Sequence, residues 1–451
     1  MSTLTQLRRL GLFDARVPRY TSYPTANHFK NEAGPEHMGR WISAIPIGAE
    51  VSLYIHIPFC RRLCWFCACR TQGTQTGAPL RGYLDVVFDE LDLVKRHLPD
   101  GVTFSRVHWG GGTPTLLPPD MIAELAGKIR DLAPFADSAE FSVEIDPNEL
   151  DDARLDALAP AGMNRASIGV QDFDEDIQSA IGRPQSFAIT KAAVDGIRAR
   201  GVESLNIDLL YGLPYQTEQR IADSVQKVLS LGPDRVALYG YAHVPWMARR
   251  QSMIPAEALP APEARLELYE TARDLFVWDG YEEIGIDHFA RPGDGLARAA
   301  REGRLRRNFQ GYTDDPAEVL IGAGASSISK FPQGFAQNNP ATSGYHSAIR
   351  EGHFATTRGH VFNGDDKLHE AMIMALMCDF RIDYGALAEA FGLEPRDIAA
   401  RLDGIDDAFP GMLAHSDGAV EIRADARPLT RMIARFLDQY ATDGQGHSAA
   451  I

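Results

Sequence analysis

The stretch that decides the fold is VSLYIHIPFCRRLCWFCAC, residues 51–69, in which an apolar segment leads into four cysteines within ten residues. Residues 51–57 have the apolar, β-branched character of a buried strand. The CxxxCxxC spacing then places Cys60, Cys64 and Cys67 on the loop that follows this strand, with Cys69 just beyond. Such crowding in a chain without a secretory leader favours metal binding over disulfides.

Three thiolates on one loop can bind three corners of a [4Fe–4S] cubane and leave the fourth iron open. The open iron can bind S-adenosylmethionine (SAM), and reduction of the cluster then yields a 5′-deoxyadenosyl radical that abstracts unactivated hydrogens. The other interpretation is a structural zinc site, although zinc usually takes four ligands as two separated pairs. We therefore expect Cys60, Cys64 and Cys67 to be cluster ligands, and Cys378, in an apolar run, to be an ordinary buried thiol.

Strand-like and helix-like segments alternate from residue 51 onward. Strands are expected at residues 51–57, 102–110, 140–146, 165–171, 204–212, 235–244 and 281–287. Helices are expected at residues 83–97, 120–132, 217–231 and 262–278. Alternating βα units predict parallel strands with helices outside. The first six units predict an α/β fold with a partial (β/α)6 barrel, whose chemistry lies at the carboxyl ends of the strands.

The rest of the chain suggests three parts: an N-terminal arm (1–50), the barrel domain and its extension (51–355), and a small, mainly helical C-terminal domain (356–451). Residues 441–451 are expected to form a frayed tail. The net charge of −16 makes nucleic acid a poor partner. Because neither a signal peptide nor a run of about 18 apolar residues is present, we expect a cytoplasmic protein without a membrane partner. Nothing in the sequence demands more than a monomer, so we expect a monomer.

Glycines and polar residues stand where the predicted strands end. The run HWGGGTPT (108–115) lets a ligand approach the backbone closely, although it could also be a plain turn. Glu144 could accept the hydroxyls of a ribose or form a salt bridge at the rim. Gln171 and Asp208 interrupt apolar strands, so their buried polar groups need partners, which a polar ligand would supply.

Three further side chains, Arg183, Tyr54 and His56, are candidates for the site. Arg183 is long enough to pair with a carboxylate, or it is a solvated loop arginine. Tyr54 and His56 lie on one face of the first strand by period-two alternation. His56 is either a satisfied core histidine or a residue that tunes the cluster or relays a proton.

The cysteine loop, with Phe66 before its third cysteine, and the glycine run resemble the signature of the radical SAM superfamily. The whole chain resembles one family within it, the oxygen-independent coproporphyrinogen III oxidases. The matching pieces are PRYTSYPT (18–25), YIHIPFC (54–60), CWFCAC (64–69), HWGGGTPT (108–115), EIDP (144–147), GVQDF (169–173), NIDLLYGLP (206–214), YAHVP (241–245), DHFARP (287–292), RNFQGYT (307–313) and CDFRIDY (378–384). Trp65 and Ala68 depart conservatively from the tyrosine and glycine that are common there.

The resemblance implies a [4Fe–4S] cluster and two SAM molecules. The first SAM would contact Tyr54, Gly111, Glu144 and Ile328. The second would contact Phe66, Gly112, Thr113, Gln171, Arg183, Asp208 and Ala242. Cys69 corresponds to an extra, non-ligand cysteine linked to activity in this family, and we place it with Tyr54 and His56 among the catalytic candidates.

The implied reaction, in heme (porphyrin) biosynthesis, converts two propionates of coproporphyrinogen III to vinyl groups and gives protoporphyrinogen IX. It needs an electron donor such as flavodoxin or ferredoxin, and an electron acceptor that the sequence does not identify. The four carboxylates of the substrate call for cationic anchors. Candidates are Arg19, Arg249, Arg250, Arg291, Arg306, Arg307 and Arg381, and aromatic lining is expected from Tyr20, Tyr23 and Phe309.

Two other functions stay open. A heme-binding trafficking protein of the same lineage keeps the barrel, but it typically lacks both a cysteine at the position of Cys69 and the PRYTSYPT arm, which are present here. The other is a radical SAM enzyme that acts on heme itself, such as a ring-opening methyltransferase.

Overall fold

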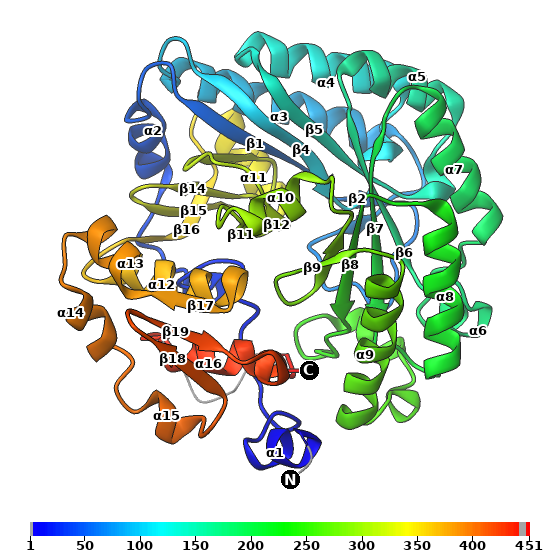
Figure 1. Cartoon of the computed structure of the whole chain (residues 1–451). Coiled ribbons are helices and arrows are strands. Elements are labelled where there is room, and N and C mark those ends of the chain that lie inside the picture. The colour runs from blue at the N-terminus through cyan, green and yellow to red at the C-terminus, as the bar shows by residue number, and fades with distance from the viewer. Residues whose placement is uncertain (1–2, 442–447) are drawn as a thin grey trace.

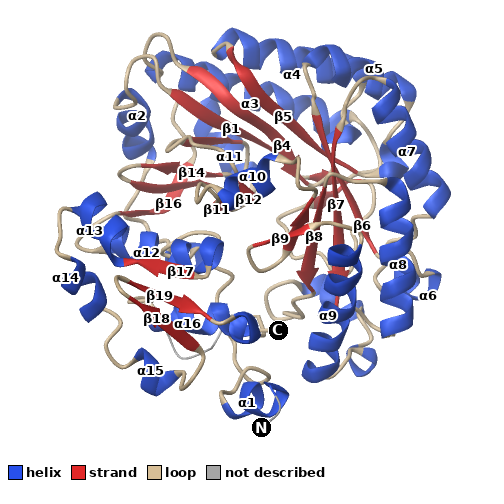
Figure 2. Ribbon diagram, viewed as in Figure 1, coloured by secondary structure: helices blue, strands red, loops and turns tan. Residues whose placement is uncertain are grey.

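The computed structural model describes residues 3–441 and 448–451, and one twelve-stranded sheet organises most of them (Figures 1 and 2). The strand order is β16-β15-β14-β13-β1-β4-β5-β6-β7-β8-β10-β9. The strands from β13 to β8 run parallel, whereas the strands at both edges pair antiparallel. The sheet curves without closing, because its edges β16 and β9 do not pair, so the predicted partial barrel is confirmed.

The parallel strands are β1 (Glu50–Ile57), β4 (Thr103–Gly111), β5 (Phe135–Ile145), β6 (Arg165–Gln171), β7 (Ser204–Tyr211), β8 (Arg235–Gly240) and β13 (Leu320–Ala323). The helices that accompany them are α3 (Ala78–His97), α4 (Pro119–Leu132), α5 (Asp152–Ala161), α6 (Glu175–Ala180), α7 (Phe187–Ala199), α8 (Glu218–Leu231) and α9 (Pro262–Trp278). Figure 1 shows α4, α5, α7 and α8 along the outer side of the curved sheet. The six predicted βα strands therefore exist, the last being shorter than expected.

The edges of the sheet and its loops contain shorter elements. The edge strands are β14 (Ile328–Phe331), β15 (Gly334–Asn338), β16 (Thr356–Val361), β9 (Glu282–Ile284) and β10 (His288–Ala290). Two small ladders pair β2 (Phe59–Cys60) with β3 (Gln72–Gly73), and β11 (Arg306–Asn308) with β12 (Gly311–Thr313). The helices here are α10 (Gly295–Arg301) and α11 (Thr342–Arg350).

The prediction of a single strand at residues 281–287 is wrong for the second half of that range. The chain turns after Ile284 and returns as β10, antiparallel to both β9 and β8. The cause is Gly285, whose φ of +56° is unfavourable for other residues. The ring of Tyr312 also fills the space that a side chain at position 285 would need.

The C-terminal part combines helices with a small sheet. Its elements are α12 (Asp366–Asp379), β17 (Arg381–Asp383), α13 (Tyr384–Phe391), α14 (Pro395–Ala400), α15 (Ile405–Ala408), β18 (Leu413–Ser416), β19 (Ala419–Ile422) and α16 (Thr430–Phe436). The strands form an antiparallel sheet in the order β17-β19-β18. The domain boundaries after residues 50 and 355 remain predictions.

The N-terminal arm contains α1 (Thr3–Arg9) and α2 (Pro35–Ser43), and its first part packs against the C-terminal part. Residues 448–451 return to the arm. Arg16 and Ala449 form an isolated antiparallel β-bridge through their backbones, and Ala450 and Ile451 are buried. The expected fraying is therefore wrong for residues 448–451, because these residues complete an apolar cluster with the arm. Residues 442–447 of that tail lie outside the described residues.

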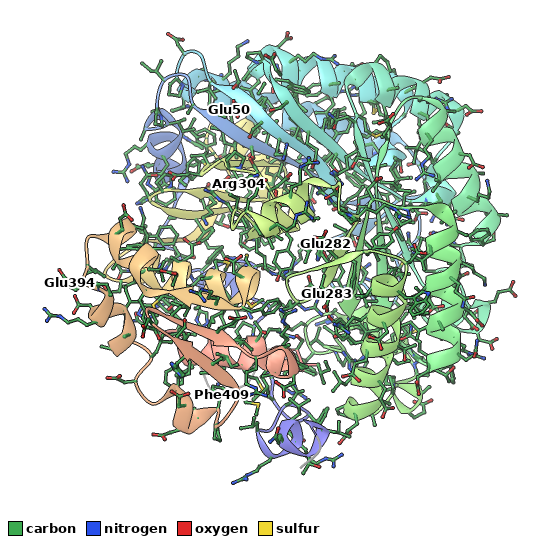
Figure 3. The ribbon with its side chains drawn as sticks, viewed as in Figure 1. Glu50, Glu282, Glu283, Arg304, Glu394 and Phe409 are labelled. Carbon is green, nitrogen blue, oxygen red and sulfur yellow. The ribbon has the colours of Figure 1, made fainter. Side chains whose placement is uncertain are left out.

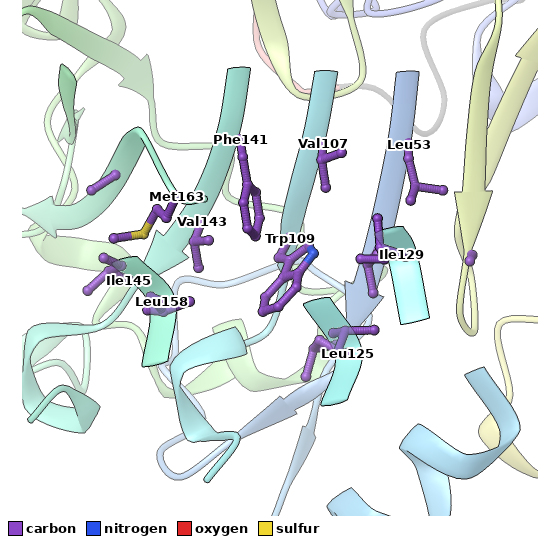
Figure 4. Packing of buried hydrophobic residues seen from close by; sticks show 14 of the residues in the cluster. Leu53, Val107, Trp109, Leu125, Ile129, Phe141, Val143, Ile145, Leu158 and Met163 are labelled. Carbon is purple, nitrogen blue, oxygen red and sulfur yellow. The ribbon is translucent and has the colours of Figure 1, made fainter. Parts of the chain in front are cut away.

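Period-two alternation gives the sheet one apolar and one polar face. In β1, Val51, Leu53, Ile55 and Ile57 are almost fully buried under the helices. In β4, Val107 and Trp109 point the same way, toward Leu125 and Ile129 of α4 (Figure 4). Within the described residues, no helix has both the length and the apolar character to cross a membrane.

Trp109 should contribute strongly to stability, because it is fully buried and packs its ring 5.0 Å from that of Phe141. We expect Trp109→Ala to lower the free energy of unfolding by about 3–5 kcal/mol, measured by urea denaturation. Trp278 is the matched control, since it is 91% exposed, and Trp278→Ala should change stability by less than about 0.5 kcal/mol. Equal effects of the two substitutions would contradict this packing.

Candidate active site

The inner, polar face of the sheet surrounds a cavity of about 860 Å³. The cavity brings together predicted site residues from several strands and loops: Tyr54, His56, Phe66, Cys67, Cys69, Gly111, Glu144, Gln171, Asp208, Ala242 and Ile328. They meet because the carboxyl ends of parallel strands lie at one edge of the sheet. Five further predicted site residues are not part of this lining: Cys60, Cys64, Gly112, Thr113 and Arg183.

Tyr54 and His56 form a hydrogen-bonded pair on β1. The Tyr54 hydroxyl lies 2.9 Å from His56 Nδ1, and the Tyr54 ring stacks on His108 with centroids 5.7 Å apart. Burial raises the pKa of Tyr54 and lowers the pKa of His56, so both groups are held neutral. His56 Nε2 lies 3.4 Å from the Arg70 carbonyl, which can only accept, so Nε2 carries the ring proton and Nδ1 accepts from the Tyr54 hydroxyl.

The glycine run at the end of β4 is required by close packing rather than by a plain turn. A Cβ at Gly111, whose φ is +110°, would lie 2.5 Å from the His56 ring, and one at Gly112 would lie 2.6 Å from the Phe59 carbonyl oxygen. The Gly111 N–H donates to Glu144 Oε2 at 3.0 Å. Glycine thus lets the strand end approach both the cysteine loop and Glu144.

Glu144 is held by two donors and faces the cavity. His108 Nε2 lies 3.2 Å from Glu144 Oε1, and the side chain of Glu144 is 40% exposed. Burial opposes its ionisation, but the hydrogen bonds from His108 and Gly111 hold the pKa of Glu144 below its usual range. A charged carboxylate fixed in this way can accept hydroxyl groups of a ligand such as a ribose.

The cysteine loop has an environment that stabilises thiolates at some positions. Hydrogen bonding from Cys69, together with the positive charges of Arg250 and Arg183, lowers the pKa of the Cys67 thiol to about 6 despite burial. Burial raises the pKa of Cys60 to about 11, although a hydrogen bond from Thr113 opposes this effect. Cys69 keeps its proton, because its hydrogen bond to Cys67 raises its pKa.

The three predicted ligands fit a [4Fe–4S] cluster better than a single ion. Among residues 3–441 and 448–451, no three His, Cys, Asp or Glu side chains are gathered around a single metal position. A cubane places each thiolate on a different iron, so its cysteines surround the cluster instead of one ion. Cys60, Cys64 and Cys67 are all free thiols, of which Cys64 is buried and the other two are half-buried.

Arg183 joins the cysteine loop to the end of β6 and is not a solvated loop arginine. Its Nη2 donates to the Gly169 carbonyl at 2.8 Å, while Nη1 lies 3.4 Å from Cys64 Sγ and 3.5 Å from Asp146. These contacts place a buried positive charge beside a predicted cluster ligand. Direct contact of Arg183 with SAM stays a prediction.

The predicted carboxylate anchors are scattered over the molecule. Arg19, Arg307 and the aromatic candidate Phe309 line the cavity. Arg249 and Arg250 line a neighbouring pocket of about 440 Å³, together with Cys67 and Cys69. The cavity is not lined by Arg291, Arg306, Arg381, Tyr20 or Tyr23. Tyr20 and Tyr23 are fully buried between the arm and the C-terminal part.

A charged layer beneath the site was missed by sequence reasoning. Arg165 Nε lies 2.7 Å from Glu140, Arg235 Nε lies 2.6 Å from Asp294, and Arg106 Nη2 lies 2.8 Å from Asp314. The available signal was alternation: Arg106 stands two residues before His108, and Glu140 four before Glu144, on the same strand faces.

The pKa of the buried Asp208 links the electrostatics of the site to the stability of the protein. Burial, assisted by the charge of Glu144, raises its pKa to about 7 from the usual 3.8, although Asn206 donates to it at 2.8 Å. A raised carboxyl pKa destabilises the folded state increasingly as pH rises from the unfolded to the folded pKa. We expect Asp208→Asn to stabilise the protein, with a gain that grows by roughly 1–2 kcal/mol between pH 5 and 7 and is constant above. A gain independent of pH in urea titrations would contradict this.

Comparisons with known proteins agree with this geometry. The sequence model of the Radical SAM superfamily matches residues 54–228. An oxygen-independent coproporphyrinogen III oxidase from Paracoccus denitrificans is 62% identical over 451 residues, 100% of both chains. One from Escherichia coli is 37% identical over 427 residues, 94% of this chain and 93% of that protein.

A solved structure supports the same assignment. The structure of coproporphyrinogen III oxidase from Escherichia coli, described as a radical SAM enzyme, matches with a TM-score of 0.89 at 36% identity. The match covers 94% of this chain and 98% of that chain, so it includes the arm and the C-terminal part as well as the sheet. By full-length similarity, the chain belongs to the oxygen-independent coproporphyrinogen III oxidase family of radical SAM enzymes.

Proposed function

We propose that this protein carries out the oxygen-independent oxidative decarboxylation of coproporphyrinogen III in heme biosynthesis. Two propionates become vinyl groups, and the product is protoporphyrinogen IX. The observation that carries the proposal is the meeting of the cysteine loop, the Tyr54–His56 pair and Glu144 around one cavity. This cavity lies in a chain that is related over its full length to oxidases of this name.

Each decarboxylation has a fixed balance of atoms and electrons. One hydrogen atom leaves the propionate carbon next to the pyrrole, the carboxylate leaves as CO₂, and one electron passes from the substrate to an acceptor. When bound, the reduced [4Fe–4S] cluster and SAM supply the 5′-deoxyadenosyl radical that takes the hydrogen atom. We propose flavodoxin or ferredoxin as the electron donor, a separate electron acceptor, and a cytoplasmic, monomeric enzyme.

The residues of the site have distinct tasks in this proposal. Cys60, Cys64 and Cys67 would hold the cluster. Contacts to the two SAM molecules would come from Tyr54, Phe66, Gly111, Gly112, Thr113, Glu144, Gln171, Arg183, Asp208, Ala242 and Ile328. The fixed carboxylate of Glu144 would orient a ribose, as its two hydrogen-bond donors hold it toward the cavity. The neutral Tyr54–His56 pair adds no charge next to the reacting carbon.

Cys69 would hold a proton at its Sγ beside the Cys67 thiolate. Its backbone N–H also donates to Cys67 Sγ at 3.4 Å, so Cys69 is fixed at the wall of the cavity. It is therefore placed to handle a proton or hydrogen atom near the substrate without binding the cluster.

Anaerobic turnover tests the proposal. Enzyme with a reconstituted cluster is incubated with SAM, a strong reductant, coproporphyrinogen III and a cell extract that supplies the acceptor. Fluorescence chromatography after oxidation should show protoporphyrin that requires SAM. Cys64→Ala should lose the visible cluster absorption and at least 100-fold of the activity, whereas Cys69→Ser should keep the absorption and lose activity. Cys378, buried away from the cavity, is the control, and Cys378→Ser should keep both.

Two outcomes would contradict parts of this proposal. An intact cluster that cleaves SAM without forming protoporphyrin, in a protein that binds heme, would replace the oxidase with a heme-trafficking function. Full turnover by Cys69→Ser would remove Cys69 from the chemistry and leave the oxidase in place.

A further inference from the structure

A second chamber, of about 460 Å³, adjoins the cavity that holds the site. Both are lined by Arg19, Tyr239, Gly240, Tyr241 and Arg307, so the two spaces lie on either side of a shared wall. The chamber lies between the last strands of the sheet, α9, and the segment that leads into α16. Glu283, on its wall, is labelled in Figure 3 where β9 faces the C-terminal part.

Some arginines of the chamber are neutralised by carboxylates. Arg273 donates to both oxygens of Glu283, at 2.6 and 2.8 Å, and Arg307 donates to both oxygens of Asp287, at 3.1 and 2.9 Å. Arg427 lies 3.8 Å from Glu283. These ion pairs leave little of the charge of the three arginines for a ligand.

Arg19, Arg265 and Arg431 line the same chamber, and within the described part of the chain none of them forms an ion pair with an Asp or Glu side chain. Arg19 donates to the Gly240 carbonyl at 2.6 Å. Arg265 donates to the Tyr241 carbonyl at 2.9 Å and to an oxygen of Ile451, the last residue of the sequence, at 3.1 Å. Carbonyl groups satisfy hydrogen bonds but carry no net negative charge. Arg19 and Arg431 therefore carry charges that no Asp or Glu side chain of the described residues neutralises in an ion pair, although Glu270, Asp274 and Asp425 also line the chamber.

Arg19 also repels both of the other arginines. Burial and the charge of Arg19 lower the pKa of Arg431 to about 9, and the same two causes lower the pKa of Arg265. Arg431 is nevertheless held firmly, since it donates to the carbonyls of Pro18, Val17, Ala449 and Ala450. An arrangement that concentrates buried positive charge becomes favourable when an anion enters it.

The walls indicate what kind of anion fits. Four tyrosines, Tyr211, Tyr239, Tyr241 and Tyr269, line the chamber with Leu266, Ile286 and Phe380. Arg265 lies 5.8 Å from the centre of the Tyr211 ring. Such a wall binds the flat, apolar rings of a ligand, while the arginine nitrogens without a protein acceptor bind its carboxylates.

We propose that this chamber binds the carboxylates of a tetrapyrrole substrate that are not undergoing decarboxylation, through Arg19 and Arg265, with Arg431 as a positioning residue. This inference rests on the proposed function and adds a subsite to it. The reacting propionate must lie in the large cavity near Tyr54 and Cys69. A ligand with four carboxylates spread around a wide macrocycle must then place others beyond that cavity, and the adjoining chamber offers unpaired cations.

Binding of coproporphyrin III, the oxidised tetracarboxylate, to the cluster-loaded enzyme tests the subsite. We expect Arg19→Gln and Arg265→Gln each to raise the dissociation constant at least ten-fold in fluorescence titrations, and Arg265→Lys to recover part of the loss. Arg427→Gln is the matched control, since Glu283 keeps Arg273 as its partner, and it should change binding less than two-fold. The tetramethyl ester of coproporphyrin III should bind the wild type and all variants equally weakly.

Turnover measured alongside separates this inference from the proposed function. The two glutamine variants should raise KM for coproporphyrinogen III and leave kcat within about three-fold. Wild-type affinity in Arg19→Gln, whose exposed side chain makes a single hydrogen bond, would overturn the subsite even if Arg265→Gln failed to fold. Arginine-dependent binding in an enzyme that forms no vinyl product would support the subsite and overturn the oxidase.

Discussion

The structure depends on one constraint: the parallel strands must bury one face under helices while the other face stays polar around a cavity. The charged layer of Arg106, Glu140, Arg165 and Arg235 meets this constraint at the base of the cavity. Burial opposes the ionisation of Glu140, but Arg165, Arg235 and Arg106 lower its pKa to about 2. Since an unpaired buried charge is costly, these ion pairs fix the relative positions of β4, β5, β6 and β8.

The site is built on this base. Strands held in register bring Tyr54, His108 and Glu144 to neighbouring positions two to four residues beyond the charged layer. Glycines at the end of β4 then allow the cysteine loop and Glu144 to approach within contact distance. Catalytic groups on strands that are fixed in this way keep their geometry without help from a ligand. The opposite side of the cavity consists of loops and of the segments that carry Arg19 and Arg307.

Local patterns were sufficient to predict the six parallel strands and the polar residues at their ends, and the family resemblance supplied other residues around the cavity, such as Phe66, Ala242 and Ile328. Apolar segments mark the strands, and residues at strand ends in a parallel sheet meet without any further information. Long-range packing was not predictable in this way. The burial of Ile451, the hydrogen bonds of Arg431 to the arm, and the turn at Gly285 depend on segments far apart in the chain. Tyr20 and Tyr23 were assigned to the cavity because their side chains are aromatic, whereas in the structure they pack in the apolar cluster that joins the arm to the C-terminal part.

The central claim is that the cavity brings a propionate side chain and the adenosyl group of SAM together for hydrogen abstraction. Coproporphyrinogen III deuterated at the propionate carbons next to the pyrroles tests it most directly. Under anaerobic turnover, mass spectrometry should find deuterium in the 5′-deoxyadenosine, in proportion to the vinyl groups formed. Vinyl product accompanied by unlabelled 5′-deoxyadenosine would contradict the account, because the hydrogen would then leave by a route that the site does not provide.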